Sequence, residues 1–259
     1  MNYKDNGKVL QNRRIIDGAQ LYDMLIECPE IAHNAEPGQI VHIACGEGTT
    51  LRRPISICET AGDCVRLCYE VRGKGTKWMA ERREGDTVSL LGALGHGFTP
   101  RDGKVLLVGG GIGIYPLLSI GKTCQNAKAL FGFRNVSLIN SLELFENNGI
   151  ETSVITDDGS SGRKGFVTEL LRDELTAGGV SQVYVCGPKP MMAVVAKLCA
   201  GFGVDCQVSM EERMGCGVGA CLACVCKTMF RDNEGAEGEK YKRVCVDGPV
   251  FDAKEIIWE

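Results

Sequence analysis

The chain has 259 residues, a formal net charge of −4 and 24% charged residues, a composition ordinary for a globular protein of two or more domains. The negative balance and the lack of a dense basic run argue against a nucleic-acid surface, and no apolar stretch approaches the ~18 residues that span a bilayer. The first seven residues show no signal-peptide core. The 14 cysteines suit a reducing, cytoplasmic setting better than a disulfide scaffold.

Residues 1–100 have the pattern of a small antiparallel barrel. Short segments rich in β-branched and apolar residues are bounded by Gly, Asp, Asn or Pro at roughly regular spacing, which predicts six strands. A helix is expected over residues 76–84, with Thr76 as its N-cap and Gly85 after its end. The predicted strands cover residues 8–14, 20–27, 39–44, 53–59, 64–71 and 87–91.

The pattern changes after the linker-like stretch 99–103. Apolar strands then alternate with helical stretches, which predicts βαβ units around a parallel sheet. The expected strands cover residues 104–109, 127–133, 153–156, 182–186 and 205–208, and the expected helices cover 115–123, 138–147, 167–177 and 189–202. The polar stretch 234–239 is expected to be a solvated loop. These changes of pattern divide the chain into domains 1–100, 101–208 and 209–259.

The third part carries four cysteines with the spacing of a plant-type iron–sulfur site. Cys216, Cys221 and Cys224 are spaced C-x4-C-x2-C, and Cys245 follows one short loop later. This spacing is typical of a [2Fe–2S] cluster held by four thiolates. The glycines between these cysteines allow backbone N–H groups to approach the sulfur atoms closely. We therefore predict a [2Fe–2S] cluster on these four residues.

Three other interpretations of the cysteines stay open. A structural zinc site more often has two C-x2-C pairs, and this segment has one. A disulfide framework needs an oxidising compartment, and free cysteines are often small buried hydrophobic residues. Cys226 is a fifth candidate ligand, because in an extended segment it shares a face with Cys224. The spacing favours Cys224.

Two features of the predicted barrel suggest contacts with phosphate. Arg53 offers a bidentate grip, and Ser56 follows it in an extended segment that Pro54 stiffens. Gly75 and Thr76 lie at the start of the predicted helix, where backbone N–H groups bind phosphates. Each feature alone also suits a surface ion pair or a turn, but together they describe two contacts with one pyrophosphate.

A glycine-rich turn follows the first strand of the second domain. Gly109, Gly110, Gly111 and Gly113 precede Pro116, which stands where a G-x-G-x-x-G fingerprint has its third glycine. Proline suits the first turn of a helix, so the departure is structurally sound. We expect the pyrophosphate of a dinucleotide at this turn.

The residues leave the choice between NAD and NADP open. The acidic residue expected ~20 positions after the turn is absent, and Arg134 suits a 2′-phosphate. Asp157 and Asp158 follow another predicted strand, at the end where α/β sheets bind ligands, and they fit a plain loop equally well.

These motifs together resemble the ferredoxin–NADP reductase superfamily. Its flavin signature is similar to the run Arg53, Pro54, Ile55 and Ser56. The resemblance implies that Arg53 contacts the FAD pyrophosphate and that Ser56 lies near flavin N5. Gly75 and Thr76 resemble the family's second phosphate contact. Cys68, Tyr69 and Glu70 resemble its strand beside the flavin. Cys186, Gly187 and Pro188 resemble its segment under the nicotinamide. His96 lies in a loop like the one that closes the flavin domain, and we expect it to have no catalytic role.

The order of the three parts resembles the electron-transfer subunits of type B dihydroorotate dehydrogenase over nearly the whole chain. The resemblance implies an N-terminal antiparallel β-barrel for FAD, an α/β parallel-sheet domain for NAD(P) and a small C-terminal [2Fe–2S] module. It also implies an FMN-containing catalytic subunit that oxidises dihydroorotate to orotate in pyrimidine biosynthesis, with two copies of each chain. Electrons would pass from FMN through the cluster to FAD and on to NAD+.

The cofactors carry this redox chemistry, so we expect no catalytic side chain. Ferredoxin–NADP reductases end in an aromatic residue that stacks on the flavin, whereas Trp258 near the end of this chain is expected to pack. One alternative keeps the cofactors and changes the partner: an NAD(P)H–ferredoxin-type reductase subunit of a hydrogenase or bifurcating enzyme. Another is a non-catalytic interaction module stabilised by zinc.

Overall fold

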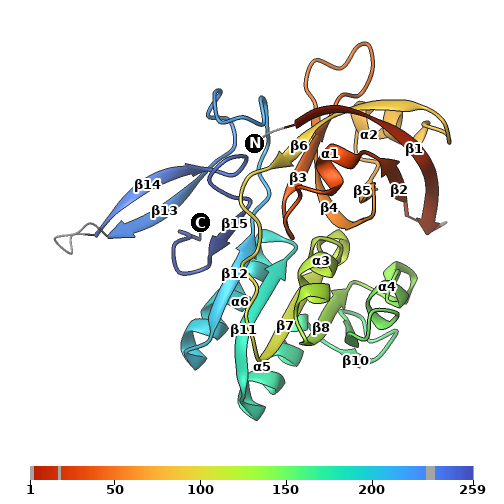
Figure 1. Cartoon of the computed structure of the whole chain (residues 1–259). Coiled ribbons are helices and arrows are strands. Elements are labelled where there is room, and N and C mark those ends of the chain that lie inside the picture. The colour runs from red at the N-terminus through yellow and green to blue at the C-terminus, as the bar shows by residue number, and fades with distance from the viewer. Residues whose placement is uncertain (1–2, 17–18, 232–236, 259) are drawn as a thin grey trace.

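Six antiparallel strands close a barrel in the order β1-β2-β5-β4-β3-β6 in the computed structural model, which describes residues 3–16, 19–231 and 237–258. Figure 1 shows this barrel in red to yellow, beside the green and cyan second domain. The predicted six-stranded barrel is confirmed. Its strands are β1 (Tyr3–Ile16), β2 (Leu21–Glu27), β3 (Ile40–Ile43), β4 (Arg53–Ala61), β5 (Cys64–Glu70) and β6 (Thr87–Leu94), with short helices α1 (Pro29–Ala32) and α2 (Lys74–Ala80) between them.

Strand β3 is buried on both of its faces. Val41 and Ile43 belong to the core inside the barrel. Ile40 points the other way and joins Leu94 of β6 in a second core shared with the rest of the chain. Because side chains alternate along a strand, His42 must lie on the same outward face as Ile40.

The second domain is a seven-stranded sheet in the order β10-β9-β8-β7-β11-β12-β15. Helices α5 and α6 pack on one face and α3 and α4 on the other, as the two apolar cores of the sheet show. The predicted parallel α/β domain is confirmed. Its elements are β7 (Lys104–Gly110), η1 (Gly111–Ile114), α3 (Pro116–Thr123), β8 (Asn126–Phe133), η2 (Val136–Leu138), α4 (Glu143–Glu146), β9 (Glu151–Thr156), β10 (Arg163–Lys164), α5 (Val167–Ala177), β11 (Val180–Cys186), α6 (Lys189–Phe202) and β12 (Asp205–Ser209).

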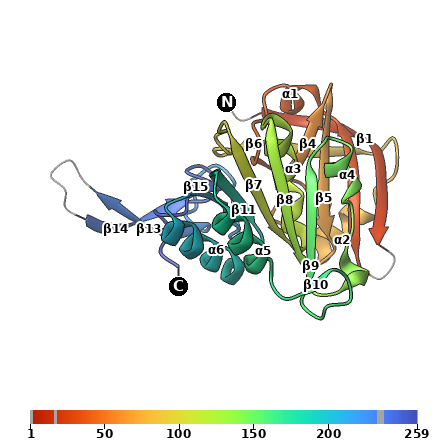
Figure 2. The ribbon, with the colours of Figure 1, turned by 90° about the horizontal axis from the view of Figure 1, so that it is seen from below.

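The C-terminal part adds two pieces of β-structure that the sequence analysis did not foresee. Strands β13 (Val225–Arg231) and β14 (Glu237–Arg243) pair as a hairpin that projects away from the body (Figures 1 and 2). Strand β15 (Val250–Asp252) pairs antiparallel with β12 and extends the sheet of the second domain. The cluster module is therefore joined to that sheet, and the boundaries at 100 and 208 stay predictions.

Three local expectations were wrong or incomplete. Thr76 is not the N-cap of α2; that residue is Gly73, and the Thr76 hydroxyl accepts from its backbone N–H at 3.2 Å. The helix expected over 138–147 is broken into η2 and α4, because Ser141 between them has a φ of 53°, outside the helical region. Of the polar stretch expected as a loop, residues 234–236 lie outside the described residues and 237–239 belong to β14.

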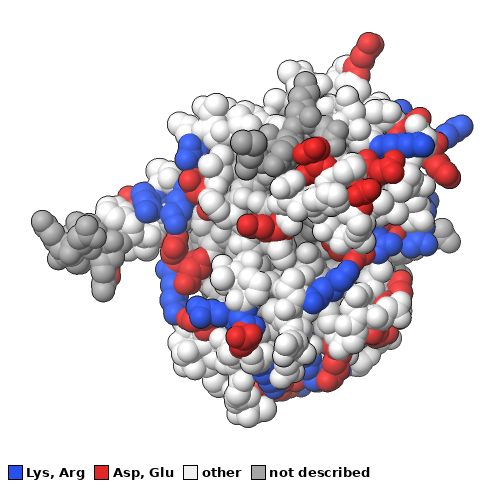
Figure 3. Space-filling model, in the orientation of Figure 1, with Lys and Arg blue, Asp and Glu red and all other residues white. Residues whose placement is uncertain are grey.

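Figure 3 shows acidic and basic side chains interspersed on the face in view, with uncharged surface between them and no continuous patch of either sign. Among the described residues, no helix is long and apolar enough to cross a membrane.

Leu94 offers a test of the contact between barrel and cluster module. Its side chain is fully buried in the core that holds Cys224 and Cys245. We expect Leu94→Ala to lower the free energy of unfolding by about 2–5 kcal/mol, because it leaves a cavity there. Leu51→Ala, at a residue that is 49% exposed, should change it by less than about 0.5 kcal/mol. Urea denaturation measures both values, and equal losses would contradict the assigned packing.

Candidate functional site

The loop between β12 and β13 is shaped around the sulfur of Cys216. The backbone N–H groups of Val218, Ala220 and Cys221 donate to Cys216 Sγ at 3.4, 3.3 and 3.4 Å. Gly217, with a φ of +74°, makes the turn that aims these donors inward. Such donors stabilise the negative charge of a thiolate bound to iron.

A second pair of thiols completes the arrangement. The backbone N–H of Cys245 donates to Cys224 Sγ at 3.4 Å. The turn that carries Cys245 is closed by Asp247, whose Oδ2 accepts from the backbone N–H and Nε of Arg243 at 2.7 and 3.0 Å. Arg243 Nη1 also donates to the carbonyl of Gly219 at 3.3 Å, so it ties this turn to the first loop.

The four predicted ligands thus fall into two pairs, because the backbone N–H of Cys221 donates to Cys216 Sγ and that of Cys245 donates to Cys224 Sγ. Two pairs suit a cluster in which each of two irons takes two thiolates. The donor set and its N–H groups fit a [2Fe–2S] cluster.

The thiols differ in their surroundings. Burial disfavours the charged form of Cys216, but the N–H donors of its loop lower its pKa to about 6. Burial and contact with Cys224 raise the pKa of Cys245 to about 12. Cys226 is also buried, and its pKa is raised to about 11 by burial and by Glu212. Cys224 Sγ, in contrast, accepts from the backbone N–H of Cys245, and this contact favours Cys224 as the ligand.

On the barrel, Arg53 and Gly75 come together as the sequence suggested. A Cβ on Gly75 would overlap the guanidinium of Arg53, so a larger residue there would displace the Arg53 side chain. The Thr76 hydroxyl, in the first turn of the helix, accepts from the backbone N–H groups of Arg72 and Gly73 at 2.9 and 3.2 Å. These residues leave Arg53 beside the start of α2, which fits the two expected contacts with one pyrophosphate.

The remaining flavin-side residues lie on two strands. In β4, Pro54 and Ser56 pair with His42 and Ile40 of β3, and Ile55 lies between them. In β5, Tyr69 points into the barrel, where its hydroxyl donates to Asn12 Oδ1 at 3.0 Å. The neighbours of Tyr69 point outward: Cys68 packs in the core shared with the second domain, and Glu70 pairs with Arg72 at 2.8 Å.

The glycine-rich turn and the segment after β11 are in direct contact. A Cβ on Gly113 would overlap the carbonyl of Cys186, and one on Gly110 would lie 3.2 Å from Pro188 Cδ. Gly111 has a φ of +57° and faces open space. Burial raises the pKa of Cys186 to about 12, which keeps its thiol neutral. The parallel pairing of β7 with β11 thus brings Gly109–Gly113 beside Gly187, at the edge where such sheets bind ligands.

Asp158 has a structural use in its loop. Its Oδ1 accepts from the backbone N–H and hydroxyl of Ser160 at 2.9 and 2.6 Å, and these bonds lower the pKa of Asp158. The backbone N–H of Asp157 donates to the carbonyl of Phe133 at 3.0 Å. The plain-loop interpretation is supported for Asp158.

The loop expected to close the flavin domain meets the cluster module. The His96 backbone N–H donates to the Gly248 carbonyl at 2.5 Å, and His96 forms a bridge with Pro249. A Cβ on Gly95 would overlap the same carbonyl. His96 therefore contributes through its backbone, in line with the expectation of a loop residue. Trp258 packs against the core that holds the thiols, as expected.

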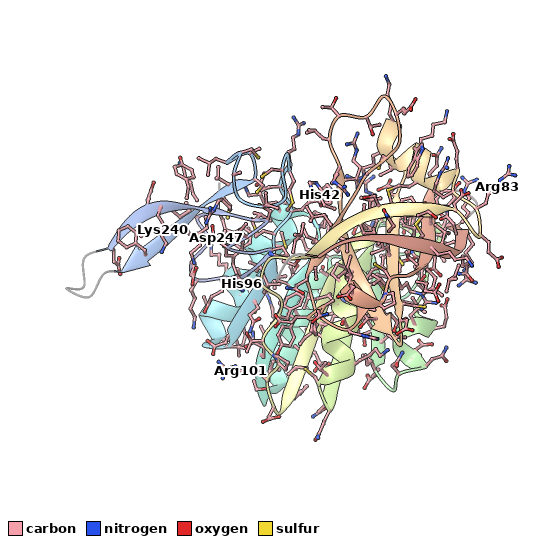
Figure 4. The ribbon with its side chains drawn as sticks, turned by 45° about the horizontal axis from the view of Figure 1, so that its top comes forward. His42, Arg83, His96, Arg101, Lys240 and Asp247 are labelled. Carbon is pink, nitrogen blue, oxygen red and sulfur yellow. The ribbon has the colours of Figure 1, made fainter. Side chains whose placement is uncertain are left out.

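Sequence reasoning missed His42. The residue is fully buried, and Figure 4 shows it where the orange barrel strands meet the blue cluster segment. Burial and then Arg52 lower its pKa to about 4, partly offset by the backbone of Cys216, so the imidazole is neutral. The sequence held one sign of this position. His42 stands between Val41 and Ile43, which face the barrel core, so it must face the opposite side of the strand.

Two family models match the chain. One, described as the iron-sulfur cluster binding domain of dihydroorotate dehydrogenase B, matches residues 211–257. The other, described as the oxidoreductase NAD-binding domain, matches residues 107–197. They coincide with the thiol site and with the glycine-rich turn.

Curated relatives match over the full length. The electron transfer subunit of dihydroorotate dehydrogenase B (NAD(+)) from Caldanaerobacter subterraneus subsp. tengcongensis is 41% identical, with 100% of both chains covered. The subunit of the same name from Geobacillus thermodenitrificans is 40% identical, with 96% of each chain covered.

Solved structures have the same architecture. A chain of the NADH-dependent reduced ferredoxin–NADP oxidoreductase, studied for flavin-based electron bifurcation, superposes with a TM-score of 0.83 at 30% identity, covering 97% of this chain and 90% of that one. The ferredoxin reductase in carbazole 1,9a-dioxygenase, with a TM-score of 0.65 at 20% identity over 78% of this chain and 67% of that one, shares the fold. Full-length identity of about 40% and the matching cluster domain show that this chain belongs to the family of dihydroorotate dehydrogenase B (NAD(+)) electron transfer subunits.

Proposed function

We propose that the chain carries electrons from the FMN of a dihydroorotate-oxidising subunit, through its own [2Fe–2S] cluster and FAD, to NAD+. One observation carries the proposal: the thiol loop (residues 210–224) packs in one core with β3, the barrel strand that pairs with the flavin segment, so the two redox sites would lie on adjoining elements. The barrel, the nucleotide sheet and the thiol loop meet along this contact.

The chain divides the work among its three parts. When bound, FAD supplies the exchange between two-electron hydride transfer and one-electron transfer to iron. Arg53 and the start of α2 bind and orient the flavin pyrophosphate. The glycine-rich turn and Gly187 receive the nicotinamide dinucleotide. Cys216, Cys221, Cys224 and Cys245 hold the irons.

The remaining site residues complete these contacts. We propose that Pro54, Ile55 and Ser56 line the flavin ring, with Ser56 near N5, and that the β5 segment Cys68, Tyr69 and Glu70 lies alongside it. In the second domain, Gly109, Gly110, Gly111 and Gly113 would face the pyrophosphate, with Cys186, Gly187 and Pro188 under the nicotinamide.

The partner is an FMN-containing catalytic subunit, with two copies of each chain in the complex. The names of the relatives specify NAD(+), which favours NAD over NADP. The four cluster ligands must be thiolates, and thiolates persist in reducing compartments, so we propose that the complex is cytoplasmic.

A second candidate is a reductase subunit of a ferredoxin-linked bifurcating complex, favoured by the 30% identity over 97% of the chain to such a structure. It predicts that the chain, with its partner, exchanges electrons between NADH and ferredoxin without dihydroorotate. The higher identity to the dihydroorotate dehydrogenase subunits favours the first candidate.

Reconstitution tests the function directly. The anaerobically purified chain is combined with the FMN-bearing catalytic subunit, and NAD+ reduction is followed by absorbance. We expect reduction that depends on dihydroorotate and on both chains, with NADP+ a poorer acceptor. Full NAD+ reduction by the catalytic subunit alone would refute the proposal. Ferredoxin reduction by NADH in place of dihydroorotate activity would support the second candidate.

Single Cys→Ser changes test the ligand set. We expect Ser at Cys216, Cys221, Cys224 or Cys245 to remove most of the iron and acid-labile sulfide, because each change deletes one of the four thiolates. Cys226→Ser is the matched control and should keep the wild-type content. Iron and sulfide are quantified chemically per chain. If the Cys226 variant lost the cluster and the Cys224 variant kept it, Cys226 and not Cys224 would be the ligand.

Arg53→Ala tests the flavin site. Removal of a charge-assisted bond to phosphate costs about 1.5–3 kcal/mol, so FAD should bind about 10- to 100-fold more weakly. Arg83→Ala, at an exposed arginine that projects from the edge of the molecule in Figure 4, should leave FAD affinity unchanged. Flavin fluorescence titration measures both, and equal affinities would place the pyrophosphate elsewhere.

A further inference from the structure

His42 has an unsatisfied imidazole in the middle of the molecule. Among the buried side chains of the described residues, polar atoms without a hydrogen-bond partner occur only on Asp23, Arg66 and His42. Asp23 and Arg66 form an ion pair with each other at 3.2 Å. His42 is 0% exposed, and neither ring nitrogen has a partner. A buried polar group without a partner keeps the full cost of its desolvation, so a retained one calls for an explanation.

The backbone holds His42 firmly in place. In the barrel sheet it is paired with Pro54 of β4 on one side and with Leu91 of β6 on the other. Arg52 Nη1 donates to the His42 carbonyl at 3.1 Å and to the Ser89 carbonyl at 2.9 Å. The imidazole therefore projects from a fixed point, one strand away from the flavin segment.

The ring faces the thiol loop. A Cβ on Gly217 would lie 2.6 Å from His42 Nδ1 and 3.2 Å from Leu94 Cδ1, so the loop backbone rests on the imidazole at the residue after Cys216. Gly217 has a φ of +74°, which favours glycine at this position for a second reason. The backbones of Cys216 and, more weakly, of Arg52 act on the imidazole in the sense of an accepting carbonyl, although neither is in hydrogen-bond geometry with it.

We propose that His42 is a positioning residue that joins the two cofactor sites: its Nδ1–H donates to the Cys216 carbonyl when the cluster is held, and so fixes Cys216 relative to the flavin strand. This inference rests on the proposed function, because it requires a cluster on Cys216 and a flavin on β4.

The bond would have two consequences. It fixes the loop whose N–H groups surround Cys216 Sγ, and so keeps those donors aimed at the sulfur. It also brings the N–H dipole of His42 near the cluster. Hydrogen bonds and dipoles of this kind raise the reduction potential of an iron–sulfur cluster, because they stabilise the added negative charge.

The matched variants are His42→Asn and His42→Leu, which have nearly the same shape. Asn can place an amide N–H where Nδ1 stands, whereas Leu has no donor. The cluster potential is measured in the FAD-loaded chain by redox titration with electron paramagnetic resonance detection. We expect His42→Leu to shift the cluster's reduction potential to a more negative value. We expect His42→Asn to leave the potential closer to that of the wild type. His33→Gln, at an exposed histidine paired with Asp63 on the same barrel, should leave it unchanged.

Equal potentials in the wild-type, Asn and Leu proteins would overturn the inference, and so would an equal shift in both variants. If His42→Leu does not fold, His42→Gln replaces it, because its longer side chain puts the amide away from the Nδ1 position. A wild-type chain without cluster or FAD would instead overturn the proposed function. The two failures are therefore distinguishable.

Discussion

The packing of the outward face of β3 against the thiol loop is the contact on which the rest of the structure depends. A four-residue strand has its inner side chains in the barrel and its outer ones in a core shared with Cys224 and Cys245. This double burial leaves no solvent between the barrel strand and the loop. Close packing of this kind allows little relative movement, because interior side chains interdigitate with few voids.

The same contact is reinforced at a second point. The loop of Gly95 and His96 bonds to Gly248, next to the turn that carries Cys245. Strand β3 thus packs against the loop of Cys216 and Cys221. The loop that follows β6 bonds next to the turn of Cys245, which is paired with Cys224. The cluster module is held at both ends of its ligand set, which is how a short segment of chain keeps four sulfur atoms in place.

Much of this could be predicted because its signals are local. Strand alternation, the glycine turn before Pro116 and the cysteine spacing each depend on residues close in sequence. The two sheets follow from them, and the cysteine spacing also supplies the predicted set of four ligands. Helices 167–177 and 189–202 were predicted with the observed bounds, because each has a clear apolar period and a glycine after its end.

The missed features depend on contacts between distant residues. Strand β15 is three residues long, and only its pairing with β12 makes it a strand. The break at Ser141 depends on a positive φ that serine rarely adopts, and its hydroxyl meets Tyr115 Oη at 3.0 Å in the fold. His42 looked like an ordinary strand residue, because its neighbour Gly217 lies 175 positions away in the sequence.

Strand β15 also constrains how electrons can leave the cluster. It joins the chain beyond Cys245 to the nucleotide sheet. The paired residues are Gln207 with Asp252, Val208 with Phe251 and Ser209 with Val250. A ferredoxin domain on a loose tether can swing between donor and acceptor. Here the segment that would hold the cluster is paired with the nucleotide sheet and shares its core, so a swing of this kind would have to break that pairing and packing.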